Sequence, residues 1–150
     1  MEKIIVYYSK TGFSKQYAQW LSEDLGIEVY SVKEVRKKQL DNAKQIIFIS
    51  SLFASMIKKL NVVKKYEKKL KVIAVGYSQE EGQNQDSNRD YATTIKELNK
   101  LSCDVYYLRG GVCFEKLGFI SRMIFSKVTG EKESKSYLDI EKLREIENNL

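Results

Sequence analysis

The sequence contains no histidine among its 150 residues, and it has only two cysteines. Without an imidazole, Ser-His-Asp catalysis and most kinds of zinc site are excluded. Cys103 and Cys113 flank an apolar segment, 105–108, that we interpret as a strand. Thiols at opposite ends of a strand lie farther apart than the roughly 7 Å between Cα atoms that a disulfide allows. We therefore expect free thiols, a reducing compartment and no bound metal.

Long hydrophobic runs are also missing. No apolar run approaches the ~18 residues of a membrane-spanning helix, and the chain opens on a strand-like segment where a signal peptide would have its apolar core. These absences predict a cytoplasmic protein. A length of 150 residues with 43% hydrophobic content is typical of one folded domain, which we place at residues 1–150.

Signatures of several other nucleotide or phosphate proteins are absent. The chain has neither the G-x-x-x-x-G-K-[ST] loop of Walker-type nucleotidases nor the G-x-G-x-x-G turn of dinucleotide-binding proteins. A phospho-receiver needs acidic residues at the end of its first strand, where this chain has Tyr7 and Tyr8. Nucleic-acid binding would rest on net charge alone, so we expect no nucleic-acid partner.

Positive charge is in excess, with a formal net charge of +6 that comes mostly from lysine. Much of the excess lies in one stretch, at Lys58, Lys59, Lys64, Lys65, Lys68, Lys69 and Lys71. One interpretation is the solvated face of a helix. The other is a docking patch for an acidic partner or for anionic lipid headgroups.

Apolar strand patterns alternate with helical patterns along the whole chain. Strands are predicted at 3–8, 27–32, 45–50, 72–77 and 105–108, and helical segments at 14–25, 33–40, 56–70, 91–101 and 140–150. This alternation predicts an α/β three-layer sandwich whose five-stranded parallel sheet is covered on both faces. An edge-like second strand favours the order 2-1-3-4-5, in which a ligand binds beyond the carboxyl ends of strands 1 and 3.

The turn after the first strand carries the strongest functional signal. Ser9, Lys10, Thr11, Gly12, Phe13 and Ser14 run directly from that strand into an amphipathic helix. Backbone N–H groups in the first turn of a helix lack partners, and the helix dipole favours an anion there. Glycine in the turn allows close approach of the backbone. The sequence therefore predicts a phosphate site, with an ordinary capped strand–turn–helix as the alternative.

This segment resembles the N-terminal signature of flavodoxins. The matching positions are Ile5, Val6, Tyr7, Ser9, Gly12, Ala18 and Leu21, and Ser14 stands where the family usually has threonine. The resemblance implies a flavodoxin-like fold and FMN as cofactor, with the 5′-phosphate of FMN held by this turn. It also implies that the flavin ring lies between the loops after strands 3 and 4.

Four residues of those two loops are candidates to contact the ring: Ser51, Leu52, Phe53 and Tyr77. Phe53 and Tyr77 are the aromatic side chains that could stack on a planar ligand. The loop from Ser51 to Ser55 has no glycine, although flavodoxins use a glycine there. A left-handed conformation would be strained in such a loop. We therefore expect the one-electron reduced state of the flavin to be poorly stabilised, and the protein to perform two-electron rather than one-electron chemistry.

Residues 110–137 exceed a minimal five-stranded flavodoxin, and 117–128 in particular look helical and apolar on several sides. They form either an extra core helix or a surface for a hydrophobic substrate, a membrane or a partner. Several short patterns are similar to flavodoxin-like protoporphyrinogen IX dehydrogenases: Gly110-Gly111, Ser121-Arg122-Met123-Ile124, Thr129-Gly130-Glu131 and Arg89-Asp90-Tyr91-Ala92. That group carries FMN and passes electrons from a haem precursor to quinone at the membrane.

Three functions remain open from the sequence. The first is an FMN-dependent oxidoreductase acting on a porphyrinogen-like or quinone substrate, with peripheral contact at the inner face of the membrane. The second is a flavodoxin-type electron carrier for a protein redox partner, and the third is a flavin-free binding module on the same fold. No side chain is identified as a general acid or base, and a homodimer is one expected state.

Overall fold

The computed structural model describes residues 3–77, 90–112, 123, 126–127 and 134–150. Its central sheet has five parallel strands in the order β2-β1-β3-β5-β6. They are β1 (Lys3–Tyr8), β2 (Glu28–Ser31), β3 (Gln45–Phe53), β5 (Leu70–Gly76) and β6 (Asp104–Arg109). Numbered among the parallel strands alone, this is the predicted order 2-1-3-4-5, so the fold prediction is confirmed.

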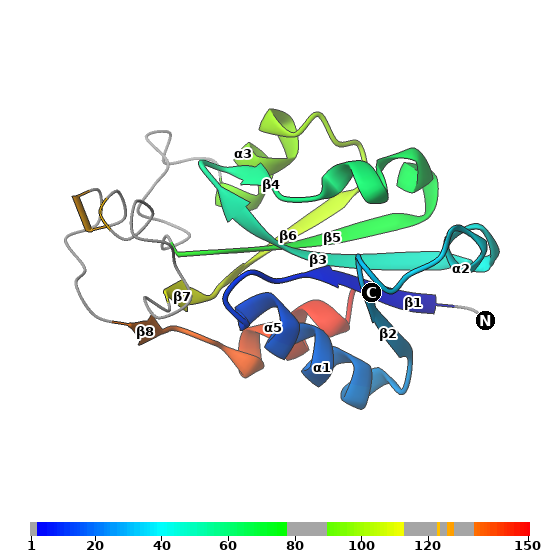
Figure 1. Ribbon diagram of the computed structural model, residues 1–150, viewed down its shortest axis with the longest axis horizontal. Helices are drawn as coiled ribbons and strands as arrows, with labels where there is room; N and C mark the ends of the chain where they lie inside the picture. Colours follow the sequence, from blue (N-terminus) through cyan, green and yellow to red (C-terminus); the bar gives the residue numbers. More distant parts are fainter. Residues whose placement is uncertain (1–2, 78–89, 113–122, 124–125, 128–133) are drawn as a thin grey trace.

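Helices cover both faces of the sheet. Figure 1 shows α1 (Phe13–Leu25) and α5 (Ile140–Glu147) together on one face, with α3 (Tyr91–Leu98) on the other. The short helix α2 (Lys37–Asn42) and the 3₁₀ helices η1 (Leu60–Val62) and η2 (Lys64–Lys69) pack on the α3 side. Because both faces are covered, the central strands are apolar along most of their length and show no polar alternation.

Successive residues of each strand therefore enter different cores. In β3, Phe48 packs in the cluster that includes Ile95 of α3, whereas Ile49 packs with Leu21 of α1 and Leu143 of α5. Gly26, in a left-handed conformation with φ 66°, ends α1 directly after the predicted helical segment 14–25. The two cores fix the register of the sheet, because a one-residue slip would exchange the two sets of side chains.

The predicted helix at 56–70 is wrong. Strand β3 continues to Phe53, and Met56–Ile57 form a short strand, β4, that pairs antiparallel with its end. The two 3₁₀ helices follow, and they still bury Val63 and Leu70 on either side of η2. The apolar spacing correctly indicated that Val63 and Leu70 are buried. The chain buries them through a hairpin and two 3₁₀ helices, however, and not through one α-helix.

A second small sheet joins the segment after β6 to the segment before α5. Strand β7 (Gly111–Val112) pairs antiparallel with β8 (Lys135–Ser136). Most of 117–128 lies outside the described residues, and Met123, which is described, is 47% exposed. Cys103 is a free, half-buried thiol, and Cys113 lies outside the described residues. Within the described part of the chain, no helix is long and apolar enough to cross a membrane.

Candidate functional site

The turn after β1 closes on itself through one side chain. The N–H of Gly12 donates to Oγ of Ser9 at 2.9 Å, and Gly12 has φ 103°, a conformation that favours glycine. Helix α1 begins at Phe13, and its first backbone bond runs from the N–H of Gln16 to the carbonyl of Gly12 at 3.0 Å. The N–H groups of residues 13–15 come before that first bond, so they have no acceptor within the helix. They point out of its N-terminus, where an anion can accept from them.

Ser14 is the unusual member of this turn. It is 2% exposed, and its buried Oγ has no hydrogen-bond partner among the residues that the structure describes. An unsatisfied buried hydroxyl costs about 1–3 kcal/mol, and native proteins contain few of them. Lys10 and Lys15 lie exposed on either side of the turn. A buried donor, unpaired N–H groups and flanking cations together fit a phosphate group.

The three candidates after β3 do not form the predicted loop. Ser51, Leu52 and Phe53 belong to β3 itself, and only Ala54 and Ser55 make the turn to β4. Those two residues have φ angles of 50° and 65°. The strain that we expected from a glycine-free loop is therefore present, in a two-residue hairpin turn that normally favours Asn-Gly. Phe53 is 64% exposed.

Sequence reasoning missed Asn99, which anchors this hairpin. Asn99 is 5% exposed, and its Oδ1 accepts from the N–H of Ile57 at 2.9 Å. Its Nδ2 donates to the carbonyls of Ser55 at 3.0 Å and Ile95 at 2.8 Å. The hairpin is thereby tied to the end of α3. No local pattern marks this role of Asn99, because its two hairpin partners, Ile57 and Ser55, lie 42 and 44 residues away along the chain.

Tyr77, directly after β5, lies in an aromatic and cationic cluster. Nε of Arg109, the last residue of β6, donates to the carbonyl of Tyr77 at 2.7 Å. The guanidinium carbon lies 3.7 Å from the ring centroid of Tyr137 and 5.5 Å from that of Tyr77. Arg109 was not among the predicted site residues, although its position before Gly110-Gly111 at a strand end was a visible signal.

These pieces share one edge of the sheet. The carboxyl ends of β1, β3, β5 and β6 lie toward the left of Figure 1, where the turn to α1, the β3–β4 hairpin and strand β7 are found. Phe13 contacts the backbone after β6, because a Cβ on Gly111 would lie 3.0 Å from Cζ of Phe13. The structure thus brings the turn that is predicted to bind phosphate (residues 9–14, called the phosphate turn below), residues 51–53, Tyr77 and Arg109 to the edge at which such sheets bind ligands.

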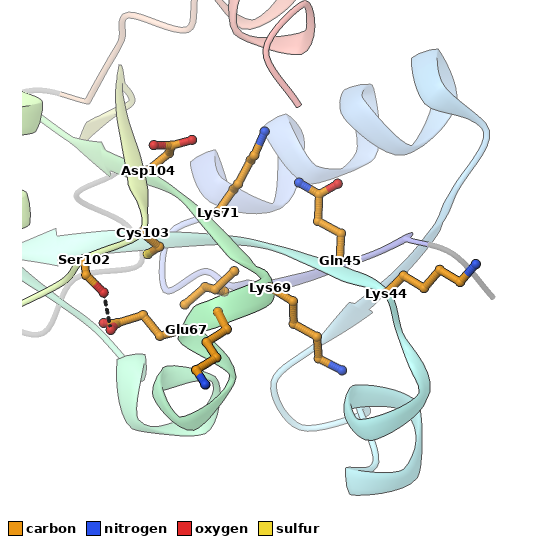
Figure 2. A pocket seen from close by; sticks show the side chains of 10 residues that line it. Lys44, Gln45, Glu67, Lys69, Lys71, Ser102, Cys103 and Asp104 are labelled. Carbon is orange, nitrogen blue, oxygen red and sulfur yellow. Dashed lines mark hydrogen bonds between the residues drawn. The ribbon is translucent and has the colours of Figure 1, made fainter.

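A cavity of about 520 Å³ lies at the opposite edge, at the amino ends of β3, β5 and β6. Its lining residues are mostly charged or polar, and Figure 2 shows the hydrogen bond between Glu67 and Ser102 among them. None of the predicted site residues lines this cavity. Burial raises the pKa of the lining thiol of Cys103 to about 11, which makes it a poor nucleophile near neutral pH.

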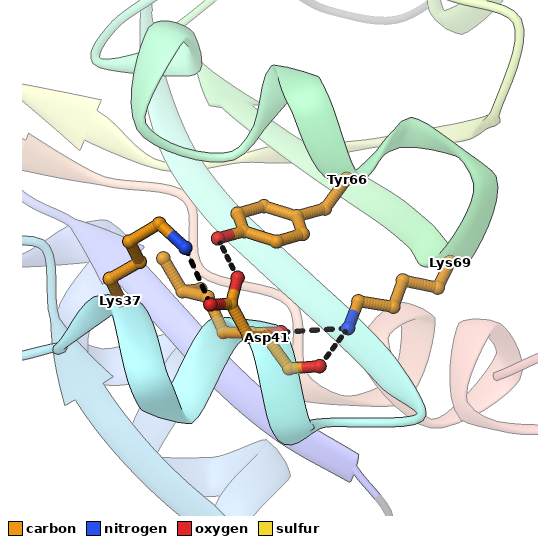
Figure 3. Close-up of polar contacts among 5 residues, drawn as sticks. Lys37, Asp41, Tyr66 and Lys69 are labelled. Atoms are coloured by element: carbon orange, nitrogen blue, oxygen red, sulfur yellow. Dashed lines mark hydrogen bonds and ion pairs between the residues drawn. The ribbon is translucent and has the colours of Figure 1, made fainter.

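The lysine-rich stretch is not one solvated helix face. Nζ of Lys69 donates to the carbonyls of Leu40, Asp41 and Ala43 at the end of α2, part of the network in Figure 3. Nζ of Lys64 likewise donates to the carbonyls of Asn99 and Lys100, which follow α3. These two lysines satisfy carbonyl groups at helix ends. Whether the remaining lysines dock a partner stays a prediction.

Comparison with known proteins identifies the family of this chain. A profile of the flavodoxin domain matches residues 4–139. The chain belongs to the flavodoxin domain family. Among solved structures, general stress protein 14 of Treponema denticola, determined in complex with FMN, has a TM-score of 0.52 at 6% identity, over 73% of this chain and 87% of that one. That likeness supports the fold alone. No curated protein sequence matches this chain significantly.

Two further structures are similar at lower scores. Flavodoxin 2 of Bacillus cereus has a TM-score of 0.47 at 13% identity, over 73% of this chain and 84% of that one. A flavodoxin from the domain Archaea has a TM-score of 0.46 at 18% identity, over 77% of this chain and 88% of that one.

Proposed function

We propose that this flavodoxin domain binds FMN and acts as an oxidoreductase. The observation that carries the proposal is the buried, unpartnered hydroxyl of Ser14 in a turn of unpaired N–H groups at the start of α1. A phosphate accepts hydrogen bonds from all of these donors at once and offsets the cost of the orphaned hydroxyl. Riboflavin lacks that phosphate, so the site should discriminate between the two flavins.

The residues present fit the cofactor as follows. Thr11, Ser14 and the N–H groups of residues 13–15 would hold the phosphate, with Ser9 keeping the turn closed. The exposed ring of Phe53 and the aromatic side chain of Tyr77 would flank the isoalloxazine. When bound, FMN supplies the hydride or electron transfer, and the chain supplies position and charge.

The finer assignment is an enzyme acting on a porphyrinogen-like or quinone substrate, in contact with the membrane. The patterns shared with protoporphyrinogen IX dehydrogenases support it, and so does the exposed Met123 within the apolar segment. The alternative is an electron carrier for a protein partner. Rapid reduction of a soluble quinone by the reduced, FMN-loaded protein would favour the enzyme, and transfer confined to a protein acceptor would favour the carrier.

Titration of the flavin-free protein with FMN and with riboflavin, followed by flavin fluorescence, tests the phosphate site. We expect one FMN per chain, bound more tightly than riboflavin. Changing Ser14→Ala should weaken FMN roughly 10- to 150-fold, because a hydrogen bond to a charged group contributes about 1.5–3 kcal/mol. The affinity for riboflavin should stay the same.

The two serines of the turn provide a matched control for stability. Ser14→Ala removes an unsatisfied buried hydroxyl and should stabilise the flavin-free protein by about 1 kcal/mol. Ser9→Ala removes the acceptor of the Gly12 N–H and should destabilise it by about 1 kcal/mol. Equal affinities for FMN and riboflavin would contradict the proposed phosphate site. If the protein bound neither flavin, the flavin-free binding module would be the supported function.

A further inference from the structure

The side chain of Arg109 is fixed by contacts that use only part of its hydrogen-bonding capacity. Its Nε–H donates to the carbonyl of Tyr77 at 2.7 Å, and its guanidinium carbon lies over the ring of Tyr137, 3.7 Å from the ring centroid. Its own carbonyl accepts from the hydroxyl of Tyr17 at 2.5 Å. Within the described part of the chain, no group accepts a hydrogen bond from Nη1 or Nη2. Four N–H donors on a half-buried, oriented guanidinium are therefore unused.

The surroundings make this orientation rigid. Tyr77 and Tyr137 pack edge to face, with ring centroids 5.8 Å apart and an interplanar angle of 74°. The N–H of Tyr137 donates to the carbonyl of Gly110 at 2.7 Å, and that of Gly110 to the carbonyl of Gly76, also at 2.7 Å. Backbone bonds thus hold both tyrosines beside Arg109. An arginine held in this way loses little conformational entropy when it binds a ligand.

The position of Arg109 is close to the flavin site but separate from the phosphate turn. Arg109 pairs with Gly76 at the end of the sheet, and Leu52 contacts the Gly76 position from the next strand. Phe13 of the turn packs on Gly110 and Gly111, directly after Arg109. The phosphate turn has its own donors in Ser14 and the start of α1. Arg109 is therefore available to a second anionic group at the same edge.

We propose that Arg109 binds a carboxylate of the organic substrate that exchanges electrons with the flavin. The inference rests on the proposed function and names its substrate class: a planar or aromatic compound with at least one carboxylate. The two terminal nitrogens of a guanidinium match the two oxygens of a carboxylate. The rings of Tyr77 and Tyr137 provide an aromatic surface beside that charge. No bond is made or broken at Arg109, which recognises and orients its ligand.

Binding of anthraquinone-β-carboxylate and of its uncharged amide to the FMN-loaded protein tests the proposal. We expect the wild type to prefer the carboxylate by roughly tenfold or more. Arg109→Gln should reduce carboxylate binding to the level of the amide while leaving amide and FMN affinities unchanged. Arg109→Lys, which keeps the charge but loses the planar fork, should retain an intermediate preference. Arg144→Gln, at an exposed arginine of α5, is the matched control for net charge.

The outcomes separate this inference from the proposed function. Normal, phosphate-dependent FMN binding without carboxylate preference would overturn the Arg109 site and leave the function intact. Loss of FMN or of folding in Arg109→Gln, together with full carboxylate preference in Arg109→Lys, would assign Arg109 a structural role and overturn the proposal. If the protein binds no flavin, the same titration of the flavin-free chain decides: an Arg109-dependent preference for the carboxylate supports the site by itself.

Discussion

At the scale of single residues, the same side chain has different roles depending on what surrounds it. Ser9 and Ser14 stand five positions apart in one turn, yet the hydroxyl of Ser9 accepts a hydrogen bond and that of Ser14 is buried with no partner in the described part of the chain. Lys69 satisfies three carbonyls at the end of α2, whereas Lys68 beside it is exposed. Residue type therefore predicts a capability, and the environment decides how it is used.

Glu147 at the end of α5 gives a prediction on pH at this scale. Burial, followed by a hydrogen bond with Asp24 and its charge, raises the pKa of Glu147 to about 7 from an ordinary 4.5. The folded state therefore binds a proton that the unfolded state releases between about pH 4.5 and 7. The resulting stabilisation is complete below the unfolded pKa and is lost as pH rises through the folded pKa.

We expect the thermal midpoint of the wild type to fall as pH rises from about 5 to 8, and that of Glu147→Gln to fall less. Circular dichroism melts across this range provide the measurement. Glu145→Gln, an exposed position on the same helix, should leave the pH dependence unchanged. Identical profiles for Glu147→Gln and the wild type would show that Glu147 is not the group responsible.

At the scale of elements, the β3–β4 hairpin is where the chain departs from the expected helix. Its turn residues, Ala54 and Ser55, are left-handed although neither is glycine or asparagine. Asn99 and the Ser55–Tyr91 hydroxyl contact of 2.7 Å hold the hairpin against α3. Tertiary contacts thus stabilise a turn that its own residues disfavour. The exposed Phe53 is presented from this anchored position.

Ala54→Gly should therefore stabilise the protein by about 0.5–1 kcal/mol, because glycine adopts a positive φ without the steric cost of a Cβ. Ala92→Gly within α3 is the matched control and should destabilise it by about 1 kcal/mol. Urea unfolding curves of both variants measure these differences. A destabilised Ala54→Gly protein would mean that the left-handed turn is not the conformation adopted in solution.

At the scale of the whole molecule, the two edges of the sheet differ in content. The carboxyl edge holds the phosphate turn, the hairpin, Tyr77 and Arg109, and strands β7 and β8 start and end the long connection there. The amino edge holds the lysine-lined cavity. Val112 pairs directly with Lys135, so the two described ends that flank residues 113–134 lie side by side at this carboxyl edge.

Replacing residues 113–134 by Asn-Gly should therefore preserve folding, because a two-residue turn suits directly paired antiparallel ends. We expect FMN affinity within about threefold of the wild type, since the phosphate donors are retained. Reduction of a hydrophobic quinone, membrane contact or self-association should be lost. Circular dichroism, flavin titration and sedimentation test these points, and a replacement that fails to fold would assign the segment to the core.

Much of the fold was predictable because its signals are short-range. The apolar runs of β1, β3 and β5, the stop at Gly26 and the turn from Ser9 to Ser14 are each contained in a few consecutive residues. The helix expected at 56–70 was wrong because apolar spacing reports burial and not hydrogen bonding. Pairing of β4 with the end of β3 needs contacts with Asn99, 42 residues from Ile57, which periodicity does not contain.

The sequence by itself determined the α/β class, the strand order and the position of the turn at residues 9–14, because hydrophobic period and turn chemistry are local properties. The tertiary structure alone decided that Ser14 is buried with no partner among the described residues, that Asn99 anchors the hairpin and that the guanidinium of Arg109 lies over the ring of Tyr137. Each of these facts depends on burial or on groups that only folding brings together. The Tyr17 hydroxyl that bonds the carbonyl of Arg109 lies 92 residues away from it along the chain.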